Sequence, residues 1–328
     1  MEKINKKKFN PIDFFGKYGI LIILVIMLIA FSIANSNFLT FENIGNILRQ
    51  TAIKGFICVG MAMVIITGGI DLSVGSVAGV CSCFMAYLLL WGVPYGLAFA
   101  IVLIAGFAIG MLNGFFINGL GLPPFIATLG TMTSFRGLAY VVTQAKPVTG
   151  YDKAFDWVGK TNIELGPVIL PVPAIIMLVL FVIGYFFLEK TRYGTYIYGV
   201  GGNEEATRLS GVNPKGIKYT VYAINGFVSA LAGIVLMART AGGQPKGGDG
   251  YEMEVITSVV LGGVSMSGGE GKIGFVLIGV FFMGILANGM VMLNVNDYWQ
   301  QVIRGLVLVA AVAFDMAMQK AKAKQIKA

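Results

Sequence analysis

Long apolar runs alternate with short polar segments along almost the whole chain. An α-helix needs about 20 apolar residues to cross the hydrocarbon layer of a membrane, and most of these runs approach or exceed that length. The runs cover 18–34, 38–66, 74–91, 93–117, 122–142, 171–188, 219–238, 273–293 and 299–318. A shorter run, 255–264, completes a span only if residues 251–254 also enter the membrane, and Glu252 and Glu254 would then point into a cavity. The pattern predicts an all-α, polytopic membrane helical bundle of about ten transmembrane helices, with about eight as the alternative.

Basic residues are concentrated on one side of these runs. They crowd residues 1–17, the polar segment 189–218 and the last residues, 319–328. The positive-inside rule makes these three segments cytoplasmic, whereas the charge-balanced 144–170 and the glycine-rich 242–250 are expected outside. The chain is therefore expected to have a basic cytoplasmic N-terminus (1–17), a single transmembrane domain (18–318) that includes the cytoplasmic loop 189–218, and a basic cytoplasmic tail (319–328).

The overall composition agrees with a membrane protein. Hydrophobic residues make up 56% of the chain and charged residues 12%, about half the charged fraction of a soluble domain. The mean hydropathy is +0.80. The net charge of +8 comes from basic residues at the ends of apolar runs, which favours membrane orientation over nucleic-acid binding.

Several kinds of chemistry are excluded by what the sequence lacks. There is no histidine, so imidazole acid–base chemistry and the commonest metal ligand are missing. Cys58, Cys81 and Cys83 all lie in apolar runs, which predicts packing residues and no metal site. The run GEGK at 269–272 is followed by Ile273, where a phosphate-binding loop has Ser or Thr. We therefore predict no catalytic site and no ATP site in this chain.

The cytoplasmic loop contains one short helix with marked ends, in the run GGNEEATRLSG at 201–211. Asn203 is placed to cap the free N–H groups of the first turn, and Glu204 follows at the positive end of the helix dipole. Gly211 supplies a left-handed residue after the helix, and Pro214 marks the start of the next one. A well-capped helix in an inside loop suggests a surface offered to a partner.

Within the spans, two features predict how helices meet. Gly106, Gly110 and Gly114 fall on one helix face and allow a close helix crossing. Arg136 lies in a span with several hydroxyl residues, which predicts that this helix faces the interior.

A break in an apolar stretch occurs at 67–75, with the sequence TGGIDLSVG. Asp71, its only charged residue, either caps the next helix or has a functional role at a discontinuous helix. Other polar residues within spans either line a polar path or make interhelical hydrogen bonds. The path candidates are Asn46, Gln50, Asp71, Asn113, Thr128, Thr131, Asn225 and Asn288.

Four of these runs resemble one known family. The family is the permease subunits of bacterial sugar-uptake ABC transporters, and the similar segments are 68–75, 201–211, 260–265 and 298–301. The resemblance extends over almost the whole chain. The resemblance is nearest to the ribose-type permease, in a group that includes galactoside, xylose and autoinducer-2 permeases.

The resemblance implies a permease of about ten helices in the vitamin-B12-importer-like (type II) class, in the bacterial inner membrane. It implies a second permease copy, a cytoplasmic ATPase subunit that uses ATP and Mg, and an extracytoplasmic sugar-binding protein. The chain itself would be no enzyme and bind no cofactor. The ATPase-coupling residues that it implies are Gly201, Gly202, Asn203, Glu204, Ala206, Arg208, Ser210 and Gly211.

The sugar stays open at this point. Ribose is favoured, and galactose, xylose and autoinducer-2 are alternatives. A different class, an ion-driven secondary sugar transporter, is disfavoured because the spans have no histidine and few central carboxylates.

Overall fold

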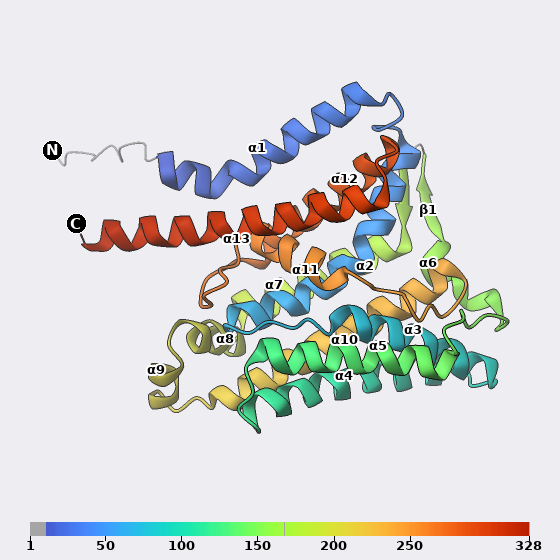
Figure 1. Ribbon diagram of the computed structural model, residues 1–328, viewed down its shortest axis with the longest axis horizontal. Coiled ribbons are helices and arrows are strands. Elements are labelled where there is room, and N and C mark those ends of the chain that lie inside the picture. Colours follow the sequence, from blue (N-terminus) through green and yellow to red (C-terminus); the bar gives the residue numbers. More distant parts are fainter. Residues whose placement is uncertain (1–10, 167, 328) are drawn as a thin grey trace.

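Figure 1 shows the computed structural model, which describes residues 11–166 and 168–327, so that Lys3, Lys6, Lys7 and Lys8 lie outside the described residues. Its long helices lie side by side along one direction. They are α1 (Pro11–Ala34), α2 (Phe41–Ile66), α3 (Val74–Leu90), α4 (Tyr95–Asn118), α5 (Pro124–Thr143), α7 (Val172–Lys190), α10 (Pro214–Thr240), α11 (Tyr251–Leu261), α12 (Ile273–Met292) and α13 (Asp297–Lys327). The short elements are a 3-10 turn (Lys153–Asp156), α6 (Trp157–Lys160), strands β1 (Asn162–Leu165) and β2 (Val168–Pro171), α8 (Arg192–Gly202) and α9 (Glu204–Leu209).

The predicted polytopic helical fold is confirmed. Each predicted span except the short run 255–264 coincides with one long helix, and seven described helices are long and apolar enough to cross a membrane. These are α2, α4, α5, α7, α10, α12 and α13. The described apolar part of α1, Gly19–Ala34, and α3 are shorter apolar helices, and α11 has only 11 residues. The last helix continues past 318 to Lys327, so the predicted tail prolongs α13.

The two ends of the bundle are different. The antiparallel β1–β2 hairpin lies at one end, which we call the hairpin end. Helices α8 and α9 lie at the opposite end, the α9 end, together with the start of α1 and the finish of α13 (Figure 1). The segment 144–170, expected as an outer loop, contains β1 and most of β2.

Helix α10 is the centre of the bundle and packs against α2, α3 and α4. The α4–α10 crossing brings backbone against backbone. A Cβ added at Gly110 would lie 2.1 Å from the carbonyl oxygen of Tyr222, and one at Gly106 would lie 2.3 Å from the Cβ of Ala230. The predicted glycine seam is confirmed, because neither position has room for a side chain.

Two helices are discontinuous. After α2 ends, residues 67–73 return from the α9 end to the middle of the molecule, and α3 then runs to the hairpin end (Figure 1). After α10 ends, residues 241–250 return from the hairpin end to the middle, and α11 then runs to the α9 end. The pair α2 and α3 and the pair α10 and α11 are therefore built alike but run in opposite directions, as in an inverted repeat.

The return of 241–250 follows α3 closely. A Cβ at Gly243 would lie 2.7 Å from the Cα of Cys83, and a Cβ at Gly75 would lie 2.1 Å from the carbonyl oxygen of Gly248. The segment 242–250, expected as an outer loop, does not project from the bundle, because its glycines let it pack along α3. Its low hydrophobicity had hidden this.

The α4–α10 seam predicts the effect of one methyl group. Replacing Gly110→Ala forces the helices apart and should cost about 1–3 kcal/mol of stability, lowering the unfolding temperature of the detergent-solubilised protein. Gly96→Ala on the same helix is the matched control, because no heavy atom lies within 4 Å of its Cβ position. Equal unfolding temperatures for the two variants would contradict the seam.

Candidate functional site

The polar loop at the α9 end contains two helices where one was predicted. Asn203 separates α8 from α9, and its side chain accepts a hydrogen bond from the backbone N–H of Ala206 at 2.9 Å. Gly211 has φ +86°, and the Asn213 side chain accepts from Gly216 before α10 begins. The predicted caps are confirmed. Helix α8 was missed, because its glycines and tyrosines make a weak hydrophobic pattern.

None of the residues of helix α9 is buried, and all of them except Thr207 are exposed. Glu205 pairs with Arg208 on the helix at 2.6 Å, and Glu204 pairs with Lys218 of α10 at 2.6 Å. Leu209 is 78% exposed. An exposed leucine on a charged, rigidly capped helix is a surface suited to a protein groove, and the sequence had not singled it out.

The end of α8 is joined to two other elements through glycine. A Cβ at Gly201 would lie 1.7 Å from the carbonyl oxygen of Ile66, the last residue of α2, and 2.6 Å from the backbone nitrogen of Gly269. That nitrogen donates to the same Ile66 oxygen at 2.8 Å. At Gly202, the next residue, a Cβ would meet nothing within 4 Å. We call this contact of α8, α2 and the turn 262–272 the glycine junction.

A tyrosine adds to the junction. Tyr198 of α8 donates a hydrogen bond from its hydroxyl to the carbonyl oxygen of Gly271 at 2.9 Å. Burial, and then the nearby Glu189 carboxylate, raises the pKa of Tyr198 to about 12. The phenol therefore stays protonated and keeps this bond at physiological pH.

The turn 262–272 is also fixed to α13. The backbone N–H of Met266 donates to Asp315 at 3.2 Å, and Ser267 donates to Gln319 at 2.8 Å. Gln319 in turn donates to Ser265 at 2.7 Å. A displacement of α8 would therefore act on α2 and on the turn 262–272, and through that turn on α13.

Four predicted path residues meet in one buried cluster at the start of α3. Asn225 of α10 donates to Asp71 at 2.9 Å, and Thr131 of α5 donates to Asn113 of α4 at 2.7 Å. Asn113 donates to Ser73 at 2.8 Å. These four residues and Ser73 are almost completely buried. The cluster joins three helices to the break at 67–73.

Asp71 lies two residues before Ser73, the N-cap residue of α3, and does not itself cap the helix, while its functional role stays a prediction. Its carboxylate accepts from the backbone N–H and the hydroxyl of Ser73, at 2.9 and 2.6 Å, just before α3 begins. It also lies at a discontinuous helix, held by Asn225. These contacts satisfy a buried charge that would otherwise be costly.

The remaining path candidates lie elsewhere. Thr128 donates to Pro124 in its own helix, and Asn288 exchanges hydrogen bonds with Asn43 of α2 at 2.9 Å. Asn46 accepts from Arg49 at 3.3 Å. Gln50 lines a cavity of about 20 Å³ between α2, α11 and α12. None of these contacts joins the Asp71 cluster, and the part they play in a path stays a prediction.

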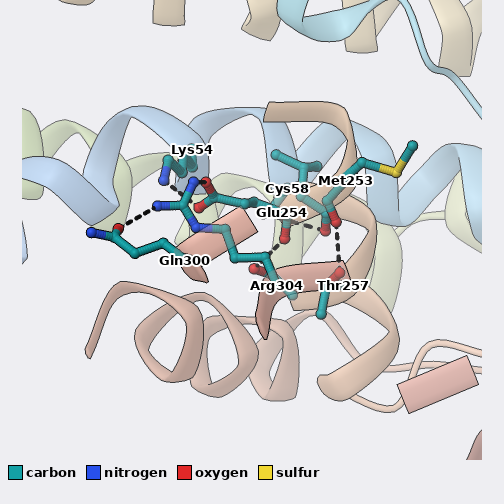
Figure 2. A network of polar contacts seen from close by, with 9 residues as sticks. Lys54, Cys58, Met253, Glu254, Thr257, Gln300 and Arg304 are labelled. Atoms are coloured by element: carbon teal, nitrogen blue, oxygen red, sulfur yellow. Dashed lines mark hydrogen bonds and ion pairs between the residues drawn. The ribbon is translucent and has the colours of Figure 1, made fainter. Parts of the chain in front are cut away.

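Charged side chains hold the first turn of α11 (Figure 2). Glu254 accepts from Arg304 of α13 at 2.9 Å and forms an ion pair with Lys54 of α2. The Lys54 ammonium also lies over the Tyr251 ring, 5.4 Å from its centre. Arg304 in addition donates to Gln300 at 3.0 Å. Residues 251–254 form the first turn of α11, but with 11 residues this helix is shorter than a full span. Glu254 is paired with cations and does not face an open cavity.

Comparison with known proteins identifies the family of this chain. Residues 43–312 match the profile of a family described as the permease component of the branched-chain amino acid transport system. The ribose import permease RbsC of Bacillus subtilis is 44% identical over 91% of this chain and 92% of its own length. RbsC of Escherichia coli K12 is 41% identical over 91% and 93%. The chain belongs to the ribose-type family of ABC transporter permeases.

Other relatives are named as permeases for different sugars. The D-allose transport system permease AlsC of Escherichia coli K12 is 39% identical over 97% of both chains. No solved structure matches this chain. The relatives are transport permease subunits, which agrees with a chain that is itself no enzyme. The three cysteines, free and buried, are packing residues as predicted.

The ion-pair network predicts a cost for losing its carboxylate. Glu254→Gln leaves Lys54 and Arg304 facing each other and should destabilise the protein by about 2 kcal/mol, less than for a fully buried pair because both cations are partly exposed. The measurement is the unfolding temperature in detergent. Glu205→Gln, whose pair with Arg208 is 65% exposed on both sides, should change stability by less than about 0.5 kcal/mol. An equal effect of both variants would contradict the network.

Proposed function

We propose that this permease forms the membrane path of a binding-protein-dependent monosaccharide importer, with ribose as the first candidate. Support for ribose comes from the names of the relatives at 44% and 41% identity. D-allose and L-arabinose permeases, at 39% and 38%, keep those sugars as alternatives, together with galactose, xylose and autoinducer-2.

One observation carries the coupling part of the proposal. Helix α9 is capped at both ends, has no buried residue and follows directly on α8, which contacts the bundle at the glycine junction. The sequence has no phosphate-binding loop and the relatives are permease subunits, so we assign ATP hydrolysis to a partner that binds this helix. The partner is a cytoplasmic ATPase subunit that binds ATP and Mg, and a second copy of this permease and an extracytoplasmic sugar-binding protein complete the assembly.

The mechanism follows from the contacts. When the ATPase pair closes, α9 is displaced as a rigid body, and Gly211 absorbs part of the backbone change. Because Gly201 has no side chain, α8 pushes directly on the end of α2 and on Gly269. The turn 262–272 passes the movement to α11 and α13, and the bundle alternates between inward-open and outward-open states.

The orientation of the chain is part of the proposal. The α9 end would face the cytoplasm of a bacterium and the hairpin end the outside of its inner membrane. Both the start of α1 and the finish of α13 lie at the α9 end, with the basic residues of 189–218 and 319–328. That clustering is what the positive-inside rule expects of cytoplasmic segments.

Helix α9 gives a direct test of coupling. Leu209→Ala should lower the amount of ATPase subunit that co-purifies by about tenfold, because burying a leucine side chain in a partner's groove contributes about 1.5–3 kcal/mol. Replacing Glu204 and Arg208 together should act in the same direction. Ile163→Ala, an exposed apolar residue at the hairpin end, is the matched control and should leave co-purification unchanged. Undiminished co-purification of the Leu209 variant would refute the docking role.

The energy source is tested separately. Sugar uptake by the assembled transporter should stop when the Walker lysine of the ATPase subunit is replaced. Uptake that persists on an ion gradient alone would instead support the ion-driven class.

A further inference from the structure

The return segment 244–250 has charged side chains at an unexpected depth. A Cβ at Gly79 would lie 2.6 Å from the carbonyl oxygen of Gly247, which places this segment beside α3 between the hairpin end and the middle of the bundle. Lys246 and Asp249 are both exposed there. α11 begins directly after it, with a left-handed Gly250 (φ +77°) and no side-chain cap.

Two more charged residues border the segment. Arg136 of α5 donates from Nη1 to the carbonyl oxygens of Pro245 at 2.9 Å and Gly247 at 2.6 Å. Glu252, in the first turn of α11, packs on α3 with Oε2 2.7 Å from the Cβ position of Gly75. Arg136 packs one turn further along, with Nη1 2.8 Å from the Cβ position of Gly79. Both side chains are only partly buried.

The exposed face of α5, on the other side of the helix from its buried residues, is also polar near its middle. Thr133 and Ser134 are exposed and donate only to backbone oxygens of their own helix. Gly130 and Gly137, on the same face, have open space at the Cβ position. Towards the ends of this helix, by contrast, the exposed residues are apolar, as in Ile126 and Val141.

Lipid cannot cover this surface. Each exposed charge at the centre of a membrane costs about 2.5–3.5 kcal/mol on insertion scales, and non-helical backbone is tolerated there only against protein or water. In the buried Asp71 cluster, in contrast, Asp71, Ser73 and Asn113 are hydrogen-bonded to protein partners, whereas the Asn225 side-chain oxygen has none among the described residues. We propose that Arg136, Lys246, Asp249 and Glu252 line a water-filled chamber, open towards the hairpin end, that binds the hydroxyl groups of a monosaccharide in transit.

The chemistry of the chamber suits a neutral polyhydroxyl ligand. The carboxylates of Asp249 and Glu252 accept hydrogen bonds from hydroxyl groups. Arg136 is fixed by two carbonyl oxygens through one nitrogen and has further N–H donors on its guanidinium. The four charges sum to zero, so an uncharged sugar can leave without a large electrostatic penalty. That the ligand is a sugar rests on the function proposed above.

Water access is tested by labelling one residue of the segment in the complete chain. In the assembled transporter, Lys246→Cys should react with a charged, membrane-impermeant methanethiosulfonate at least about tenfold faster than Val182→Cys. Val182 is a matched control, 54% exposed in the middle of α7. The unmodified chain is the blank, because its three cysteines are free but buried. The modification should also block sugar uptake.

Two results would overturn the chamber. One is reaction of Lys246→Cys at no more than the Val182→Cys rate. The other is complete modification that leaves uptake unchanged. Absence of monosaccharide uptake by the unmodified transporter would overturn the proposed function instead, while the ratio of labelling rates still decides whether the chamber is hydrated.

A second variant tests the sugar contact. Glu252→Gln should lower the initial uptake rate about tenfold at saturating sugar-loaded binding protein, with partial recovery in Glu252→Asp. Membrane level and ATPase co-purification should stay unchanged, which a merely structural role would not allow. Glu164→Gln, an exposed acid in the hairpin, is the matched control. Uptake by Glu252→Gln at the rate of that control would overturn the contact.

Discussion

Backbone that leaves the helical state inside a membrane must still have its N–H and C=O groups hydrogen-bonded, and two segments of this permease meet that constraint at mid-depth. In 67–73, the Tyr222 hydroxyl donates to the carbonyl oxygen of Ile70 at 3.1 Å and Asp71 accepts from Ser73. In 241–250, the Ser82 hydroxyl accepts from the Gln244 N–H at 3.2 Å, while Arg136 donates to two further carbonyl oxygens. The rest of the bundle is arranged around the place where these segments meet.

The two segments differ in how they satisfy that constraint. In the first, Asp71 and Ser73 are buried and are hydrogen-bonded to side chains of α4 and α10. The second is held by glycine packing on α3 and by one arginine, and it leaves charges exposed. This asymmetry separates a structural support from a surface that a ligand can reach. Because α11 starts from the second segment and ends at the glycine junction, the same short helix connects that surface with α8 and α9.

Much of this architecture could be predicted from local sequence. Span lengths are set by membrane thickness, so most helices appear as apolar runs, and Asn203 and Gly211 mark α9 through capping rules that act over a few residues. The position of 242–250 could not be predicted, because a glycine-rich polar segment has no hydrophobic signal and its partners on α3 are far away in sequence. The contact of Arg136 with Gly247 is equally long-range. Arg136 was expected to face the interior, but nothing in its neighbourhood indicated what it would hold.

If α9 and the chamber are coupled through the glycine junction, movement of α9 at one end changes water access to the chamber at mid-depth. The most direct measurement is the modification rate of Lys246→Cys in the assembled transporter, with and without trapped ATP on the ATPase subunit. We expect the modification rate to differ by about fivefold or more between the two states. This difference should disappear when Gly201→Ala disrupts the glycine junction, and it should remain when Gly202→Ala is introduced beside it. Equal rates in both nucleotide states, in a transporter that still couples ATP hydrolysis to uptake, would contradict it.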